Sequence, residues 1–322
     1  MLEIKRLRLL WALHARGTIT AVAEAYNYSP SAVSQQLRIL ERDAGVPLLR
    51  RVGRTLEFTP AAEALVAETE GLLAGLERAE TALHRAREEV SGTVRVAAFQ
   101  SALLAIVPPA VRLLQQEHPA LRVEVTHHEP GDALQETWGR GFDLVIAEQY
   151  PEHARAHSHG LNRENLAWDP IRIALPERGA AAARFDRPRE LRDLAELPWV
   201  MESKGAATRL WAEQICRAAG FEPDVRFETT DLHAHVRLIE AGVAVGLLPA
   251  LAQAGEAPRV RLLELPDLPY RTIFTAARAS RESHPALVAV RRALRTAAAG
   301  LQRDGITAHP GDAATGIAAG SR

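Results

Sequence analysis

The clearest pattern of apolar and polar positions lies in the stretch "YSPSAVSQQLRILERDAG", which begins at Tyr28. At about 100° of rotation per residue, its apolar side chains fall on one narrow stripe of a helix and its polar side chains fall on the opposite side. The polar side holds short hydrogen-bonding groups and arginine instead of the Glu/Lys pairs that usually coat an exposed helix, so we interpret it as a contact surface. The apolar set is Val33, Leu37, Leu40 and Ala44, and the polar set is Ser31, Gln35, Arg38 and Arg42, with Ser34 on the flank.

This helix is the third of three that the pattern predicts at the start of the chain. Ser29 is a suitable N-cap, and Pro30 falls in the first turn, where its missing N–H costs nothing. A first helix is expected over residues 3–15 and a second from its N-cap Thr18 to about Tyr26. Three short helices with a tight turn between the last two predict a helix-turn-helix, in which the third helix enters the major groove of DNA.

The next segment, "PLLRRVGRTLEFTP", predicts two short strands about Gly53, with Arg50, Arg51 and Arg54 at the tip of a basic wing. Residues 1–60 hold nine Lys/Arg against five Asp/Glu, whereas the whole chain has a formal net charge of −1. The N-terminal end is therefore the end that we expect to meet a polyanion.

A long helical run follows, from Thr59 and Pro60 to about Glu89. About thirty residues at a rise of 1.5 Å each would make a rod roughly 45 Å long. Leucines at heptad-like spacing form a stripe that the neighbouring sequence has little to cover, so we expect a dimer helix, with packing on its own domain as the alternative. The stripe comprises Leu65, Leu72, Leu76 and Leu83, with Thr69 as its one polar member.

From Thr93 onward, strand patterns alternate with helical patterns, which predicts α/β structure on a mostly parallel sheet. Two sets of about eighty residues each are joined by strands, so we expect a hinged pair of lobes with a cleft between them. Residues 304–322 are rich in Gly and Ala and are predicted to be disordered. Strands are expected over 93–98, 122–126, 142–148, 171–176, 197–201, 224–229, 243–249, 259–265 and 270–278, and helices over 101–118, near 132, and over 205–220, 232–241 and 285–303.

The composition, 47% apolar over 322 residues, is typical of a globular protein with two or three domains. No run of eighteen apolar residues occurs, and early charges such as Glu3, Lys5 and Arg6 interrupt any signal-peptide core, so we expect a cytoplasmic protein without a membrane partner. The single cysteine, Cys216, cannot form an intramolecular disulfide. We interpret it as a buried apolar residue, with a redox sensor as the alternative.

Over nearly its whole length the chain resembles the LysR-type transcriptional regulators. The specific part is "TITAVAEAYNYSPSAVSQQLRILERDAGVPLLRRVGRTLEFTPAAEAL", which has the Ser-x-x-x-Val-Ser-x-Gln-Leu core, the Leu-Glu pair after it and the family's entry to a linker helix. Leu49 stands where the family commonly has Phe, and Ala62 where it commonly has Gly. The C-terminal half matches more weakly, through "HPALRVEV", "FDLVIAE" and "AGVAVGLLP".

The resemblance implies an α/β chain with an N-terminal all-α winged helix-turn-helix, a long linker helix and a two-lobed, periplasmic-binding-protein-like effector domain. It implies a transcriptional regulator that binds double-stranded DNA as a homodimer or homotetramer, senses a small molecule and needs no cofactor. The expected divisions are residues 1–59, 60–90 and 91–303, with a first lobe over about 91–165 and 268–303, a second lobe over about 166–267, and the tail 304–322.

The resemblance also assigns the DNA-binding residues. Ser31, Ser34, Gln35 and Arg38 would face base edges or nearby phosphates, because glutamine can pair with adenine and arginine with guanine. Arg51 and Arg54 of the wing would hold the DNA backbone or the minor groove. Thr18, Ser29 and Pro30 complete the expected set, and an ordinary solvated helix face is the alternative.

Helix N-termini that face the cleft are the candidate effector site, because their N–H groups and positive dipole end favour carboxylates or phosphates. We therefore expect a small anionic metabolite as the effector. Each hydroxyl at these positions could instead be a simple helix cap. The candidates are Gln100, Ser101, Ser203, Thr229 and Thr230.

The sequence contains no G-x-S-x-G elbow, H-E-x-x-H, Cys-x-x-Cys pair or Walker glycine loop, so it offers no catalytic set for an enzyme. A solute-binding protein would share the two lobes, but it would need an export signal that the sequence does not show. A metal-responsive regulator is the other alternative, although "YPEHARAHSHGLN" is typical of a polar loop. Its candidate ligands are His127, His128, His153, His157 and His159.

Overall fold

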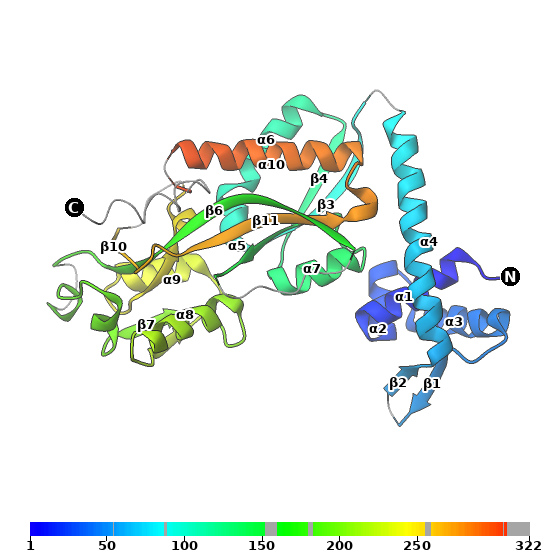
Figure 1. Cartoon of the computed structure of the whole chain (residues 1–322), viewed down its shortest axis with the longest axis horizontal. Helices are drawn as coiled ribbons and strands as arrows, with labels where there is room; N and C mark the ends of the chain where they lie inside the picture. Colours follow the sequence, from blue (N-terminus) through cyan, green and yellow to red (C-terminus); the bar gives the residue numbers. More distant parts are fainter. Residues whose placement is uncertain are drawn as a thin grey trace.

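The computed structural model describes residues 1–53, 55–86, 89–151, 160–179, 183–254, 259–304 and 306–307. Figure 1 shows a small N-terminal domain at one end of an elongated molecule, the long helix α4 (Pro60–Arg85) upright beside it, and two lobes that make up the rest. Among the described residues, no helix is long and apolar enough to cross a membrane. The N-terminal domain contains α1 (Ile4–Arg16), α2 (Ile19–Tyr26), α3 (Pro30–Ala44), β1 (Leu49–Val52) and β2 (Thr55–Phe58).

The predicted helix-turn-helix is confirmed, and its causes are local. Asn27 adopts the left-handed conformation, with φ of 55°, which ends α2 and turns the chain sharply. The Ser29 hydroxyl then accepts a hydrogen bond from the Ala32 N–H at 3.1 Å and starts α3. The apolar stripe of α3 is buried in a core that includes Trp11 of α1, so the polar side of α3 is turned outward.

Helix α4 (Pro60–Arg85) begins at Thr59, as predicted, but it ends at Arg85 rather than near residue 89. One face, which carries Val66 and Leu73, is buried against the N-terminal core. The predicted stripe is wrong at Leu65, which packs partly on that core, and at Thr69, which is fully buried. The other three leucines of the stripe are open in the single chain: Leu72, Leu76 and Leu83 are 53%, 37% and 71% exposed.

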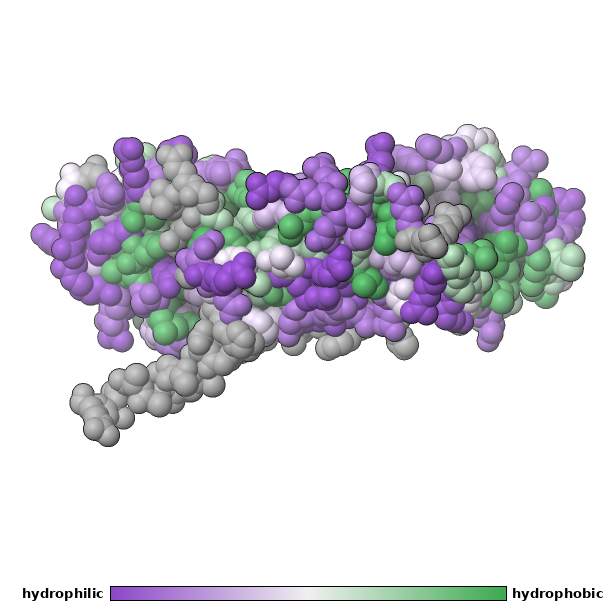
Figure 2. Space-filling model, turned by 90° about the horizontal axis from the view of Figure 1, so that it is seen from above, coloured by the Kyte–Doolittle hydropathy of each residue, from purple (hydrophilic) through white to green (hydrophobic). Residues whose placement is uncertain are grey.

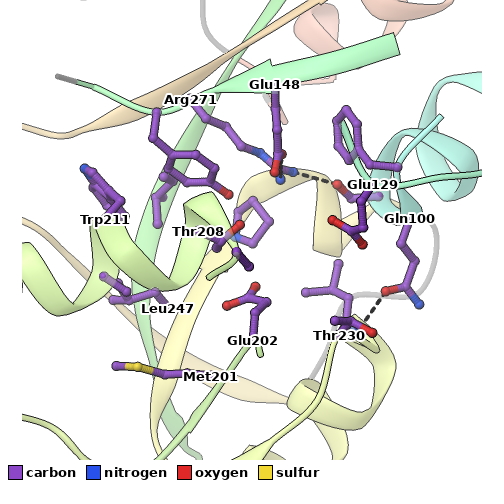
Figure 3. Close-up of a pocket in the computed structure, with 18 of the residues that line it drawn as sticks. Gln100, Glu129, Glu148, Met201, Glu202, Thr208, Trp211, Thr230, Leu247 and Arg271 are labelled. Atoms are coloured by element: carbon purple, nitrogen blue, oxygen red, sulfur yellow. Dashed lines mark hydrogen bonds and ion pairs between the residues drawn. The ribbon is translucent and has the colours of Figure 1, made fainter. Parts of the chain in front are cut away.

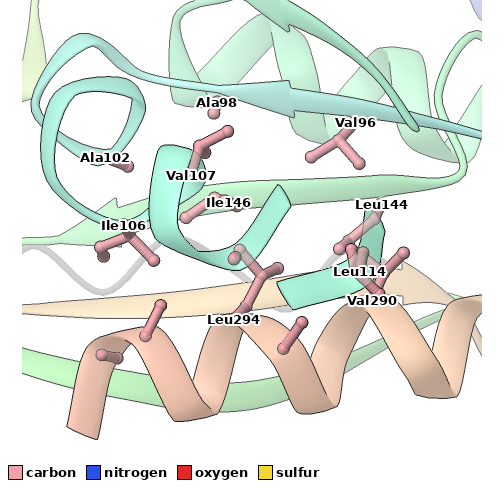
Figure 4. Packing of buried hydrophobic residues seen from close by; sticks show 14 of the residues in the cluster. Val96, Ala98, Ala102, Ile106, Val107, Leu114, Leu144, Ile146, Val290 and Leu294 are labelled. Carbon is pink, nitrogen blue, oxygen red and sulfur yellow. The ribbon is translucent and has the colours of Figure 1, made fainter. Parts of the chain in front are cut away.

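The first lobe has a parallel sheet covered by helices. Strand β3 pairs with β4 and with β5 in parallel, and buried aliphatic side chains from these strands pack against α6 and α10 (Figure 4). The helix predicted over 101–118 is two helices, because the chain starts a new helix at Val107 with prolines in its first turn. The elements are β3 (Gly92–Ala98), α5 (Gln100–Ala105), α6 (Val107–Glu117), β4 (Leu121–His127), α7 (Pro130–Trp138), β5 (Leu144–Gln149) and α10 (Pro285–Arg303).

Two long strands, β6 (Leu161–Pro176) and β11 (Tyr270–Arg278), connect the lobes. Up to Pro170, β6 pairs antiparallel with β11; from Ile171 it pairs with β9 (Gly246–Pro249) and β10 (Val260–Glu264) of the second lobe. The prediction placed a strand only over 171–176, and its mostly parallel sheet is wrong here, because the chain crosses between the lobes in opposite directions. The pairing changes a few residues beyond the lobe boundary expected after residue 165.

The second lobe contains β7 (Pro198–Met201), α8 (Ala207–Ala218), β8 (Asp224–Glu228) and α9 (Leu232–Glu240), together with β9 and β10. Its core packs aromatic side chains, among them Trp199, around α8. Cys216 lies in this core with no solvent exposure, and burial raises the pKa of its thiol to about 12. A thiol that stays protonated is a poor redox sensor, so the buried apolar interpretation of Cys216 is the one that the structure supports.

The N-terminal domain packs directly on the first lobe of the same chain. The rings of Trp11 in α1 and Trp138 in α7 lie 4.7 Å apart between centroids. The Glu77 carboxylate of α4 accepts from Arg278 Nε at 2.8 Å and from Arg140 Nε at 3.2 Å, in a largely buried environment. The linker helix is therefore fixed to the effector domain by a buried ion-pair network.

Candidate DNA-binding surface and effector cavity

The outer face of α3 is the candidate DNA-binding surface. Ser31, Gln35, Arg38 and Arg42 are exposed on it, as the sequence predicted. The Ser34 hydroxyl donates to the Pro30 carbonyl at 2.9 Å. Thr18 and Ser29 are helix caps that accept from backbone N–H groups at 3.1 Å, so their hydroxyls shape the helices.

Two polar residues hold this face in position, and the sequence reasoning did not assign them that role. Arg6 of α1 donates to Gln36 at 3.1 Å and to Asp43 at 2.8 Å, which ties α1 to the flank of α3. Glu41 accepts from the N–H groups of Leu48 and Leu49 at 2.9 and 3.0 Å, which fixes the start of the wing. Charged residues at the boundary of the apolar stripe were the available signal.

The predicted wing is present as the β1–β2 hairpin. Arg50 pairs across the hairpin with Glu57 at 2.8 Å, so part of the basic charge is neutralised there. Arg51 is exposed on the same hairpin. Arg54, the third predicted wing arginine, lies outside the described residues.

A cavity of about 70 Å³ lies between the two lobes, beside the point where the paired strands β6 and β11 pass from one lobe to the other (Figure 3). Side chains from both lobes converge on it: β5 and the start of α7 on one side, and the segment after β7 and helix α8 on the other. Its lining includes the aromatic residues Phe99, Tyr150 and Trp211, the carboxyl groups of Glu129, Glu148 and Glu202, and the guanidinium of Arg271.

Arg271 is the centre of a buried polar network at this crossing. Its Nε and Nη2 atoms donate to Asp169 at 2.8 and 2.6 Å, its Nη1 pairs with Glu148, and Nη2 also donates to the Ser101 hydroxyl at 2.6 Å. Asp169 has no solvent exposure and accepts a further bond from the Leu251 N–H at 3.0 Å. The Arg271 guanidinium is thus already bound to carboxylates of the protein itself.

The structure brings together some of the predicted effector residues. Gln100, Ser101 and Thr230 line the cavity, whereas Ser203 and Thr229 do not. The Thr229 hydroxyl instead accepts from the Asp231 N–H at 3.1 Å. The sequence analysis did not identify five further lining residues: Glu148, Tyr150, Glu202, Trp211 and Arg271. The one signal in the sequence that could have indicated them was the presence of charged residues at the ends of predicted strands.

The start of α9 offers few free donors to the predicted anionic effector. Helix α9 begins at Leu232 with Asp231 as its N-cap, and its first N–H groups are bonded to Gln100 at 2.6 Å and to the Asp231 carboxylate at 2.9 Å. The α9 donors expected to bind an anion are therefore engaged by the protein. The carboxyl groups of the lining would also repel an anion.

The predicted histidine ligands are not gathered in the described part of the chain. His127 and His128 lie at the end of β4, while His153, His157 and His159 lie outside the described residues. No group of three or more potential metal ligands occurs among the residues that the structure describes. The metal-responsive alternative gains no support there.

Comparison with known families assigns both halves of the chain. Residues 4–63 match the family model of the bacterial regulatory helix-turn-helix protein, lysR family, and residues 87–299 match the LysR substrate binding domain. The chain belongs to the LysR family. Such regulators bind DNA and small-molecule effectors and form oligomers, and they are transcription regulators rather than a class of enzyme.

Relatives of this LysR-family regulator are distant in sequence but cover most of it. The malonate utilization transcriptional regulator of Klebsiella pneumoniae is 26% identical, over 84% of this chain and 86% of the relative. The dual regulator OxyR of Escherichia coli (strain K12) is 27% identical, over 84% and 88%.

Solved structures share the fold. A full-length OxyR variant from Pseudomonas aeruginosa has a TM-score of 0.66 at 17% identity and covers 92% of this chain and 95% of its own. Full-length CbnR complexed with its target DNA has a TM-score of 0.51 at 21% identity, over 92% and 100%. The predicted combination of a winged helix-turn-helix with a two-lobed effector domain is confirmed.

Proposed function

We propose that this regulator reads its operator with the outer face of α3. The observation that carries the proposal is the separation of α3 into a buried apolar stripe and an exposed face of serine, glutamine and arginine. Ser31, Gln35 and Arg38 would contact base edges or nearby phosphates, while Arg51 and Arg54 of the wing would contact the DNA backbone or minor groove. Thr18, Ser29, Pro30 and Ser34 would hold the helices in the reading position.

We also propose that the three segments predicted from the sequence have separate functions. Residues 1–59 would bind DNA, residues 60–90 would link and dimerise, and residues 91–303 would bind the effector in the cytoplasm. The cavity supports the last role, because a ligand there would touch both lobes and so favour one lobe arrangement over another. Within it, Gln100, Ser101 and Thr230 are the proposed contacts.

Gln35→Ala tests the reading role of α3. If the Gln35 amide pairs with a base, the substitution should lower discrimination between operator and random DNA by about 1–3 kcal/mol. Gel shifts with both DNAs measure this. Arg51→Ala is the matched variant, since loss of a backbone contact should weaken binding to both DNAs alike. Equal loss on both DNAs for Gln35→Ala would remove it from base recognition.

A further inference from the structure

The interlobe cavity carries an excess of negative charge that comes from both lobes. Glu129 and Glu148 belong to the first lobe, and Glu202 follows β7 in the second lobe (Figure 3). Among the described residues that line the cavity, Arg271 is the one arginine or lysine, and it is bound to Asp169 and Glu148. The Arg271 charge is therefore neutralised within the protein, and no other arginine or lysine in the described lining pairs with the remaining carboxyl groups.

These carboxyl groups interact across the cleft. Burial raises the pKa of Glu148, Arg271 opposes that rise, and Glu202 and Glu129 add to it. Burial likewise raises the pKa of Glu202, against the opposing charges of His235 and Arg271. A positive charge placed between the lobes would relieve this repulsion, whereas a negative charge would increase it.

The walls of the cavity suit an organic cation. Phe99, Tyr150 and Trp211 are each no more than 5% exposed, and Met201 and Leu247 extend the apolar surface. Aromatic faces attract ammonium and guanidinium groups, most strongly where water is excluded. A volume of about 70 Å³ accommodates a few water molecules, at about 10–15 Å³ each, so the ligand must be compact.

We propose that the effector is a compact organic cation, whose ammonium group lies between Glu148 and Glu202 and whose apolar part packs against Tyr150 and Trp211. This inference rests on the proposed function of the cavity as the effector site. Binding neutralises charge on both lobes at once, and this stabilises the arrangement in which the two lobes face each other across the ligand.

An amine and an α-amino acid share this ammonium group. Helix α8 distinguishes them, because Ala206 and Thr208 at its start line the cavity and no side chain caps its N-terminus. The carboxylate of an amino acid would lie there, beside the uncapped N–H groups. An amine would leave that end of the cavity to water.

The test uses the full-length protein and a panel of primary amines with four to nine non-hydrogen atoms. Each amine is matched with the α-amino acid that has the same side chain, and with the carboxylate that this amino acid would give without its amino group, for example n-butylamine, norvaline and valerate. Calorimetry should show binding of at least one amine or amino acid, at least tenfold tighter than that of its matched carboxylate. An amino acid that binds better than its amine identifies α8 as a carboxylate site.

Two variants locate the binding. Glu202→Gln should weaken the best cation by about tenfold or more, because it removes one charge and keeps the shape of the side chain. Glu196→Gln, an exposed acid of the same lobe, should leave the affinity unchanged. Preference for the carboxylates, absence of binding by every amine and amino acid, or equal loss in both variants would overturn the inference.

A gel shift with upstream DNA on the same preparation distinguishes failure of the cation inference from failure of the proposed function. Operator binding without any cation binding overturns the cation inference alone. Failure of the wild-type protein to discriminate any upstream DNA from random DNA overturns the proposed function itself.

The affinity for the cation should also rise as the pH rises above the range in which a glutamate side chain ordinarily titrates. The raised pKa of Glu148 and of Glu202 means that protons compete with the cation as the pH falls, so binding releases protons. The charged groups that face this pair are Glu129, Asp169, His235 and Arg271. An affinity that falls as the pH rises would contradict the inference.

Discussion

Replacement of both Leu72 and Leu76 by glutamate should convert the protein to monomers and lower operator affinity by about 100-fold or more. Both leucines are exposed in the single chain, and they flank the face of α4 that carries the buried Val66 and Leu73. Carboxylates on this face cannot be buried in a helix pair without a large desolvation cost. One N-terminal domain would then contact one half-site without the advantage of the second.

Sedimentation and gel shifts measure the two effects on the same samples. Leu210→Glu is the control, because Leu210 is 48% exposed on α8 of the second lobe, whereas α4 packs on the N-terminal domain and the first lobe. It should leave both the assembly and the operator affinity unchanged. A Leu72/Leu76 double variant that stayed dimeric, with wild-type affinity, would exclude this face of α4 from the interface.

Arg271→Met should lower the free energy of unfolding by about 3–5 kcal/mol at neutral pH, because it leaves buried carboxylates without their partner. Asp169 is fully buried, and Glu148 is 10% exposed at its side chain. Without Arg271, the pKa values of both carboxyl groups in the folded state should lie further above their unfolded values. The loss of stability is therefore full at pH 7–8 and shrinks as the pH falls and the carboxyl groups take up protons.

Urea unfolding at two pH values tests this prediction. The control is Arg172→Met, which removes an ion pair with Glu264 whose side chains are 28% and 56% exposed. That change should cost no more than about 1 kcal/mol. Equal losses for the two variants, or a larger loss at low pH for Arg271→Met, would contradict the assigned role of the network.

The N-terminal domain and the order of most elements could be predicted from the sequence because their causes are local. The Ser29 cap, Pro30 in the first turn and the apolar residues of α3 at helical spacing lie within one short stretch, so periodicity and capping alone locate the helix. The burial of the single cysteine, Cys216, could be predicted for the same reason, since an apolar helical context predicts burial. The exposed leucine stripe of α4 was also visible, apart from Leu65.

The charge of the effector cavity was decided by the tertiary structure alone. Glu148, Glu202 and Arg271 are far apart in the sequence, and they meet because β6 and β11 cross between the lobes at that point. Sequence patterns located the helix starts near the cleft, but they could not show that Gln100 and Asp231 occupy the N–H groups of α9. Local sequence determines where helices begin and which residues carry charge. Only long-range packing determines which of these N–H groups and charges remain free to bind a ligand.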